Sequence, residues 1–444
     1  LGVGSEIWGC GGSMRPEYYS DLYRRYSTYC RNYDGNHLFR IASGASDYDY
    51  NWTKVLMDRV GQRMNGLSLH YYTVTGWNGS KGSATKFGNE DYYWTMGKCR
   101  EIEDVIKKHC AIMDEFDKDK HVALMLDEWG TWWDEEPGTV RGHLFQQNTM
   151  RDALVASLTF DIFHKYTDRL KMANIAQVVN VLQSMILTKG KEMVLTPTYY
   201  AFKMYSVHQD ATYLPLDISC DTVNVRGERR VPMVSATASK DKNGEIHISL
   251  SNIDVIRFPD KYFEGIAGYN ELMLSLEFYQ RFEDYEYMLI HQTDAYLFKP
   301  ELSYWCLKGY DYIGAPWFKP KKILKTKIYN FALRFCPFLY TEKAKRRHSL
   351  YNFKHILEVV PSILLDKYKS NDATDHNEDV FWGVEALRLN KAFKKPDWKE
   401  ALKFSLEEYP SIAYKMNKEQ LPFGCHAFNV HETDFWKQFI APLN

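Results

Sequence analysis

Two glutamates with similar surroundings are the residues whose types and spacing most clearly suggest chemistry. Glu6 stands two positions before Trp8, and Glu128 directly precedes Trp129. Two carboxyl groups can together break a glycosidic bond, because a protonated one donates to the leaving oxygen while an ionised one attacks the anomeric carbon. The neighbouring tryptophans can supply apolar faces on which a sugar ring stacks.

Each glutamate ends a predicted strand. Residues 1–6 and 122–128 are short, largely apolar runs, and the carboxyl ends of the strands surround the catalytic mouth of a parallel barrel. A single strand-final glutamate is more often a surface or capping residue. Two of them in the same setting favour a catalytic pair.

Short apolar runs alternate with amphipathic stretches up to about residue 207. Strands are predicted at 1–6, 38–42, 66–72, 122–128 and 172–179, and helices at 16–31, 52–60, 91–117, 145–164 and 197–207. This alternation predicts a parallel α/β sheet. Residues 1–209 are therefore expected to form a partial (β/α)8 TIM barrel of about five βα units. Because a closed barrel has eight units, about three are expected to precede Leu1.

The apolar pattern changes to period two between residues 210 and 256. Runs at 222–225, 231–238 and 245–251 alternate apolar and polar residues, and Lys242-Asn243-Gly244 suits a hairpin turn. This segment is expected to be a short antiparallel remnant of a β-sandwich. Residues 257–444 return to a mixed α/β pattern and are expected to form a separate region.

Several motifs of the N-terminal part occur in an order typical of one enzyme family. They are GCGGSMRPEY at 9–18, IASGA at 41–45, LSLHYY at 67–72, DEWG at 127–130 and MANIAQVVN at 172–180. Together they make residues 1–254 resemble the glycoside hydrolase family 51 α-L-arabinofuranosidases. That resemblance implies a retaining hydrolase that removes terminal α-L-arabinofuranosyl residues from arabinose-containing oligosaccharides or polysaccharides.

The resemblance also implies residue roles. Glu6 corresponds to the general acid/base and Glu128 to the nucleophile. His70 and Tyr72 correspond to residues that orient the nucleophile and contact the furanose. It implies no cofactor or metal for the hydrolase, and assembly into a homo-oligomer.

Four further positions are expected to contact the substrate. Gln177 and the faces of Trp8 and Trp129 are expected to help bind the sugar ring. Ser5 stands where the family usually has an asparagine that bonds to the sugar 2-hydroxyl. Serine is shorter and has no NH2 group, so losing that hydrogen bond is expected to cost about 1–3 kcal/mol in the transition state.

A second resemblance covers residues 258–444. The motifs YMLIHQTDA at 287–295, GYDYIGAPW at 309–317, NEDVFW at 377–382 and PFGCHAF at 422–428 resemble the C-terminal part of a bacterial GT-A-like glycosyltransferase domain of unknown function. Asp294 would then hold Mg²⁺ or Mn²⁺, with His426 as a late ligand. Asp379 or Glu378 would deprotonate the acceptor hydroxyl.

Composition and charge exclude several classes of protein. The chain of 444 residues has 56 basic and 57 acidic residues and a net charge of -1, which argues against a nucleic-acid partner. No apolar run approaches the ~18 residues of a transmembrane segment, and no signal peptide is visible, so a cytoplasmic location is expected. The eight cysteines are scattered without zinc spacing and are expected to be free thiols.

Two alternatives to an arabinofuranosidase stay open. One is a nucleotide-sugar-dependent glycosyltransferase acting through the C-terminal region, and the other is an inactive carbohydrate-binding remnant. Hydrolysis by two carboxylates needs no metal, whereas transfer through Asp294 does. Because an open five-unit sheet exposes two edges, the chain alone is expected to be poorly soluble or weakly active. The junction between the two regions is expected to be a fusion of two incomplete folds.

Overall fold

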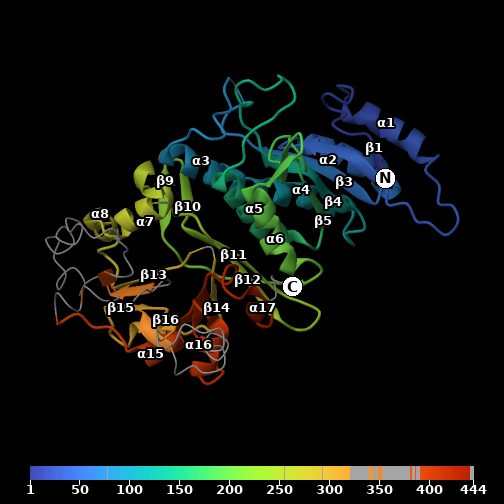
Figure 1. Cartoon of the computed structure of the whole chain (residues 1–444). Helices are drawn as coiled ribbons and strands as arrows, with labels where there is room; N and C mark the ends of the chain where they lie inside the picture. The colour runs from blue at the N-terminus through green and yellow to red at the C-terminus, as the bar shows by residue number, and fades with distance from the viewer. Residues whose placement is uncertain are drawn as a thin grey trace. The chain divides into compact units, whose positions relative to one another are not determined.

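The computed structural model of the chain divides into two compact units, Leu1–Ile256 and Arg257–Asn444 (Figure 1). The structure describes residues 1–440 apart from 78, 255, 293, 321–339, 344–348, 353–380, 383–385 and 387–390. No helix in those residues is both long enough and apolar enough to cross a lipid bilayer. The seven cysteines in the described part of the chain are free thiols, as predicted.

A parallel sheet of five strands, in the order β1-β2-β3-β4-β5, organises the first unit. The strands are β1 (Gly2–Val3), β2 (Ile41–Ser46), β3 (Gly66–Thr73), β4 (Ala123–Thr131) and β5 (Leu170–Ile175). The helices are α1 (Pro16–Ser27), α2 (Tyr50–Val60), α3 (Asn89–Arg100), α4 (Ile102–Phe116), α5 (Met150–Phe163) and α6 (Pro197–Tyr205). This alternation confirms the predicted partial α/β barrel.

Two predicted elements have different bounds. β1 ends at Val3 instead of residue 6, and β4 continues past Glu128 to Thr131. The single helix predicted at 91–117 is two helices, α3 and α4, separated by Glu101. The Glu101 carboxylate accepts hydrogen bonds from Lys98 and Tyr48 at this break.

Local signals set the helix starts. Pro16 and Pro197 lie in the first turns of α1 and α6, where their missing N–H groups leave no hydrogen bond unmade. Thr149 and Asp152 form a capping box at the start of α5: the Thr149 N–H donates to Asp152 at 2.7 Å. This helix therefore begins at Met150, later than the predicted residue 145.

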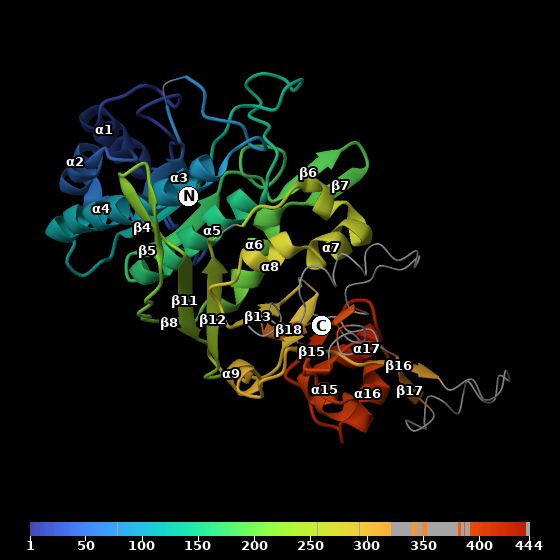
Figure 2. The same ribbon diagram turned by 90° about the vertical axis from the view of Figure 1, so that its left-hand side faces the viewer.

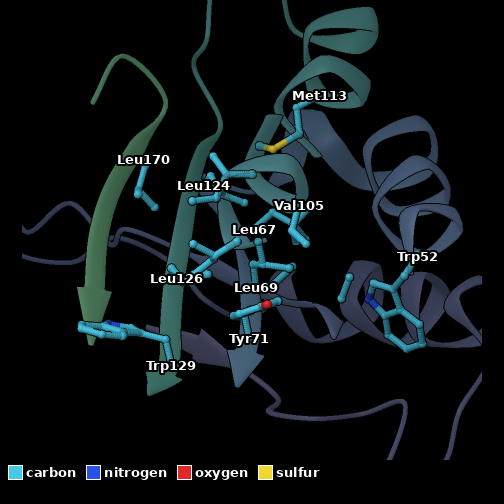
Figure 3. Close-up of a cluster of buried hydrophobic side chains, with 14 of the residues drawn as sticks. Trp52, Leu67, Leu69, Tyr71, Val105, Met113, Leu124, Leu126, Trp129 and Leu170 are labelled. Carbon is cyan, nitrogen blue, oxygen red and sulfur yellow. The ribbon is translucent and has the colours of Figure 1, made fainter. Parts of the chain in front are cut away.

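Residues on one face of the central strands form the core between the sheet and its helices (Figure 3). Leu67, Leu69 and Tyr71 of β3 lie on this face. Leu124, Leu126 and Trp129 of β4 share it. Fully burying one such side chain stabilises the fold by about 1.5–3 kcal/mol. Because these residues face the helices, the other residues of the strands are left for the opposite face.

Trp129 belongs to this core, and the prediction that it forms a sugar-stacking face is wrong. Its side chain is 1% exposed and packs edge-on against Phe160 and Phe163 and parallel to Phe202. Successive strand residues point to opposite faces of a sheet, so Trp129 points to the helices when Glu128 points away from them.

Replacing Trp129 by Ala should lower the free energy of unfolding of the first unit by about 3–5 kcal/mol, the range for deleting a buried aromatic side chain. Urea unfolding followed by far-ultraviolet circular dichroism measures the change. Trp77→Ala is the control, because Trp77 is 53% exposed. Equal losses in the two variants would contradict the core position of Trp129.

A small antiparallel sheet follows the barrel strands within the same unit (Figure 2). Its strands are β8 (Thr212–Leu214), β11 (Val234–Lys240) and β12 (Ile246–Asn252), in the order β12-β11-β8, beside a hairpin of β9 (Thr222–Val225) and β10 (Arg229–Pro232). Buried Asp161 of α5 accepts hydrogen bonds from Ser235 at 2.5 Å and Tyr205 at 2.8 Å, so it joins this sheet to the barrel helices. A further hairpin joins β6 (Ile186–Lys189) and β7 (Glu192–Leu195).

The second unit contains helices and short strands in mixed order. Its strands form sheets β13-β18-β15, β14-β20-β19 and β16-β17. They are β13 (Tyr287–Ile290), β14 (Ala295–Leu297), β15 (Tyr312–Gly314), β16 (Trp317–Pro320), β17 (Tyr340–Lys343), β18 (Ser349–Asn352), β19 (Ser405–Leu406) and β20 (Gly424–His426). Its helices include α7 (Gly265–Met273), α8 (Leu276–Gln280), α9 (Leu302–Cys306), α15 (Trp398–Phe404), α16 (Pro410–Met416) and α17 (Thr433–Trp436). The GT-A-like fold of this unit stays a prediction.

Candidate active site

Two carboxyl groups and an imidazole meet at the carboxyl ends of the parallel strands. Glu6 follows β1, His70 lies near the end of β3, and Glu128 lies near the end of β4. One carboxyl oxygen of each glutamate and one ring nitrogen of His70 all lie within 4.8 Å of one another. The structure thus brings together the two glutamates that the sequence singled out.

Glu6 reaches this position from a tight turn and not from a strand end. Its φ is +46°, and its carbonyl oxygen accepts hydrogen bonds from Gly9 N at 2.8 Å and Gly11 N at 2.9 Å. A Cβ atom at Gly11 would lie 2.0 Å from Ser5 O, so the turn requires glycine at that position. The prediction that Glu6 closes a strand is therefore wrong, although the turn still directs its carboxyl group to the site.

A β-bulge on β4 presents two consecutive acidic residues to His70. Ser68 pairs with Met125 and His70 pairs with Glu128, so β4 has one extra residue between these pairs. Glu128 Oε2 lies 3.2 Å from His70 Nδ1, and Asp127 Oδ1 lies 3.2 Å from His70 Nε2. In a regular strand these neighbouring side chains would point to opposite faces.

His70 is buried among three carboxyl groups. Its Nδ1 lies 3.0 Å from Glu6 Oε1 and 3.2 Å from Glu128 Oε2. Burial by itself lowers the pKa of His70, but contacts with Asp127, Glu6 and Glu128 outweigh burial and raise that pKa to about 9. At neutral pH the ring therefore carries a positive charge, which offsets the repulsion between the carboxylates.

Tyr72 supports Glu128 from two residues further along β3. Its hydroxyl donates a hydrogen bond to Glu128 Oε1, and its ring packs edge-on against Trp132 at 5.1 Å. Burial and the Glu128 carboxylate both raise the pKa of Tyr72 above its ordinary value, so the phenol keeps its proton and acts as a donor. The site therefore holds one oxygen of Glu128 in a fixed direction.

Replacing Tyr72 by Phe should lower kcat/KM about 10–100-fold, because a hydrogen bond to a charged group contributes about 1.5–3 kcal/mol. Initial rates with a 4-nitrophenyl arabinofuranoside measure the loss. Tyr71→Phe is the matched control, since the Tyr71 hydroxyl donates to Lys98 O on the helix side of the sheet. A similar loss in both variants would contradict the role of Tyr72.

The remaining predicted contact residues lie at different depths. Trp8 is half-buried, donates its indole N–H to Gly44 O at 3.1 Å, and meets His70 edge-on at 6.3 Å. Ser5 and Gln177 are exposed, and within the described residues neither side chain bonds to the two glutamates. Their contact with substrate stays a prediction.

Sequence reasoning missed three residues of the site. Asp127 was quoted in the DEWG motif without a role, and the bulge that turns it toward His70 has no sequence signal. The thiol of Cys10 donates a hydrogen bond to Glu6 Oε2 at 3.0 Å. The only sequence signal for this contact is that Cys10 follows Glu6 in the same turn. Trp132 packs on Tyr72, and its position four residues after Glu128 was a signal that could have been used.

The second unit brings together two of its four predicted site residues. His426 Nε2 lies 3.0 Å from Asp294 Oδ1 and 2.8 Å from Gln292 Oε1. His426 Nδ1 lies 3.2 Å from Glu407 Oε1, and both of these side chains are 2% exposed. Glu407 was not predicted, whereas Glu378 and Asp379 lie outside the described residues.

Known proteins resemble the two parts of the chain separately. The intracellular exo-alpha-L-arabinofuranosidase of Bacteroides ovatus is 80% identical over 254 residues, which are 57% of this chain and 49% of that protein. The crystal structure of the GH51 arabinofuranosidase from Xanthomonas axonopodis pv. citri matches with a TM-score of 0.56 and 49% identity, over 58% of this chain and 52% of that one. The first unit is similar to part of a glycoside hydrolase family 51 α-L-arabinofuranosidase. This finding confirms the resemblance predicted from the motifs.

More distant proteins also match the first part of the chain. An intracellular exo-alpha-(1->5)-L-arabinofuranosidase of Bifidobacterium longum is 23% identical over 284 residues, 55% of this chain and 46% of that protein. The chain spans about half the length of the curated relatives it matches. Residues 252–426 match the family described as a protein of unknown function, DUF5672. The C-terminal region is therefore distinct from the family 51 part, as predicted.

Proposed function

We propose that the first unit is a retaining, exo-acting α-L-arabinofuranosidase. The observation that carries this proposal is the pair of carboxyl oxygens of Glu6 and Glu128 within 4.8 Å of each other. Retaining glycosidases place their carboxyl groups about 5–5.5 Å apart, whereas inverting ones need about 6.5–9.5 Å to admit a water molecule. The short separation supports direct attack by one carboxylate.

In the first step Glu128 attacks the anomeric carbon while Glu6 donates its proton to the aglycone oxygen. The bond to the aglycone breaks and an arabinosyl ester of Glu128 forms. In the second step the Glu6 carboxylate takes a proton from water, the water oxygen attacks the anomeric carbon, and Glu128 leaves as a carboxylate. Arabinose is released with its original anomeric configuration, and both glutamates regain their starting states.

The neighbours of the two glutamates suit this cycle. The Tyr72 hydroxyl donates to Glu128 Oε1, and His70 Nδ1 lies 3.2 Å from Oε2, so both oxygens of the proposed nucleophile are held in place. Protonated His70 lies 3.0 Å from Glu6 Oε1, so a proton stands within transfer distance of the acid/base. Half-buried Trp8 provides an apolar wall beside the imidazole ring.

The names of the relatives support the substrate class. The Bacteroides ovatus relative is named an intracellular exo-alpha-L-arabinofuranosidase. We extend these properties to this chain as proposals: terminal arabinofuranosyl residues as the substrate, and a location inside the cell. Self-association into a homo-oligomer stays a prediction.

Arabinofuranoside hydrolysis by the full chain should be unchanged by EDTA, because two carboxylates and a water molecule complete the reaction without a metal. Rates of arabinose release before and after dialysis against EDTA measure this. A fall of more than about twofold that added Mg²⁺ or Mn²⁺ restores would contradict hydrolysis by the glutamate pair alone. Arabinose binding without release would instead favour a carbohydrate-binding remnant.

A second candidate function rests on the contact between Asp294 and His426. We propose that these two side chains hold Mg²⁺ or Mn²⁺ in a sugar-nucleotide transferase site of the second unit. The donor set fits, since Nε2 of His426 faces Asp294 while the buried carboxylate of Glu407 holds Nδ1. Such a metal would neutralise the diphosphate of a sugar nucleotide. Mn²⁺ binding that Asp294→Asn weakens supports the proposal, and equal binding in both chains overturns it.

A further inference from the structure

The small antiparallel sheet of the first unit packs on the barrel helices with one of its faces. On that face the Ser249 hydroxyl of β12 lies 2.8 Å from His208 Nε2, and the Thr237 hydroxyl of β11 lies 3.0 Å from His164 Nδ1. Because successive strand residues point to opposite faces, the residues on either side of Ser249 and Thr237 point away from the barrel. These residues form the outer face of the sheet.

The outer face carries a row of large apolar side chains beside a row of small ones. Ile246, Ile248 and Leu250 of β12 are 63%, 63% and 64% exposed. The register of the two strands sets Ala238 of β11 opposite Ile248 and Ala236 opposite Leu250. Alanine is too short to cover its larger neighbour, so the row on β12 stands higher than the row on β11.

Almost no charge interrupts these two rows. Residues 246–252 of β12 include no lysine, arginine, aspartate or glutamate, and β11 has a charged residue only at its end, Lys240. A sheet with one apolar face is stable in water when a second layer covers that face. A contiguous exposed apolar row therefore marks a surface for protein association.

We propose that this outer face packs against the same face of a second copy of the chain. A twofold axis that runs parallel to the strands, between β11 and β12, places the large row of each copy over the small row of the other. Ile248 of the partner subunit then lies over Ala238, and the partner subunit's Leu250 lies over Ala236. The two sheets become the layers of an aligned β-sandwich, about 10 Å apart.

The pairing of a large row with a small row favours a second copy over an unrelated protein. The face is complementary to itself, as an interface with twofold symmetry requires. Two strands of seven residues present an area of only about 10 by 24 Å. Stable interfaces bury about 1,200–2,000 Å² in total, so we expect a reversible dimer whose population rises with protein concentration.

Sedimentation-velocity ultracentrifugation of the full chain at increasing protein concentration tests the dimer. The native chain should pass from monomer to dimer. Ile248→Lys should raise the dissociation constant at least about tenfold, because it sets two like charges close together across an apolar contact. Ile248→Glu should do the same. Leu307→Lys is the matched control and should leave the dissociation constant unchanged, since Leu307 is 88% exposed and belongs to the second unit.

An equimolar mixture of the Ile248→Lys and Ile248→Glu chains separates this interface from a loss of folding. Opposite charges then meet across the contact, so the mixture should associate more tightly than either variant alone. A native chain that stays monomeric at every concentration overturns the proposal. Equal association of the native chain and Ile248→Lys, or a mixture no tighter than its separate components, also overturns it. None of these outcomes bears on the proposed hydrolysis, because the interface does not include Glu6 or Glu128.

Discussion

Replacing Glu128 by Gln should lower kcat for arabinofuranoside hydrolysis by about 10⁴–10⁶-fold, the range seen when a nucleophile is removed. An amide oxygen attacks an anomeric carbon poorly, so the arabinosyl ester cannot form. The Tyr72 hydroxyl can still donate a hydrogen bond to the amide oxygen at position 128, and His70 stays beside that side chain. The variant should therefore fold as the native chain does.

Glu115→Gln is the matched control for this change. Glu115 is exposed on α4 and does not belong to the cluster of Glu6, His70 and Glu128. It should keep the rate of the native chain. A Glu128→Gln variant that retained more than a tenth of native kcat, with unchanged circular dichroism, would exclude Glu128 as the nucleophile.

Replacing Glu6 by Gln should lower kcat about 10²–10⁴-fold, the usual contribution of general acid–base catalysis. The loss should depend on the leaving group. An arabinosyl oligosaccharide needs its aglycone oxygen protonated, whereas 4-nitrophenolate leaves without a proton. The first step should therefore suffer less with the nitrophenyl substrate, and release of the sugar from Glu128 should become rate-limiting.

Azide provides the control for the role of Glu6. It attacks the arabinosyl ester without needing a base, so it should accelerate turnover of the nitrophenyl substrate by the Glu6→Gln variant. It should not accelerate Glu128→Gln, in which no ester forms. Equal losses on both substrates together with no effect of azide would contradict the acid/base assignment.

The sequence predicted the glutamate pair, His70 and Tyr72 correctly as neighbours. Order along the chain was sufficient there, because consecutive parallel strands bring their carboxyl ends to one edge of the sheet. The alternation of strand residues also predicts that Trp129 turns away from Glu128, and the expectation of a sugar-stacking Trp129 overlooked this. Its burial among Phe160, Phe163 and Phe202 depends on the β-bulge as well, because regular alternation from Leu124 and Leu126 would place Glu128 on the helix side.

Other features had no signal in the sequence. The extra residue that turns Asp127 toward His70 depends on how β4 pairs with β3, and pairing is a property of both strands. The position of Glu6 depends on the turn closed by Gly9 and Gly11. In the second unit, the contact between His426 and Glu407 depends on the pairing of β19 with β20.

A covalent arabinosyl ester on Glu128 is the intermediate on which hydrolysis by the glutamate pair depends, and mass spectrometry of the Glu6→Gln chain tests for it most directly. With 4-nitrophenyl α-L-arabinofuranoside, ester formation should continue in this variant while hydrolysis of the ester is slow. The intact protein should gain one arabinosyl group, and the peptide that contains Glu128 should carry it. The adduct should be absent from the Glu6→Gln, Glu128→Gln double variant. Turnover without an adduct, or an adduct on another residue, would contradict the account.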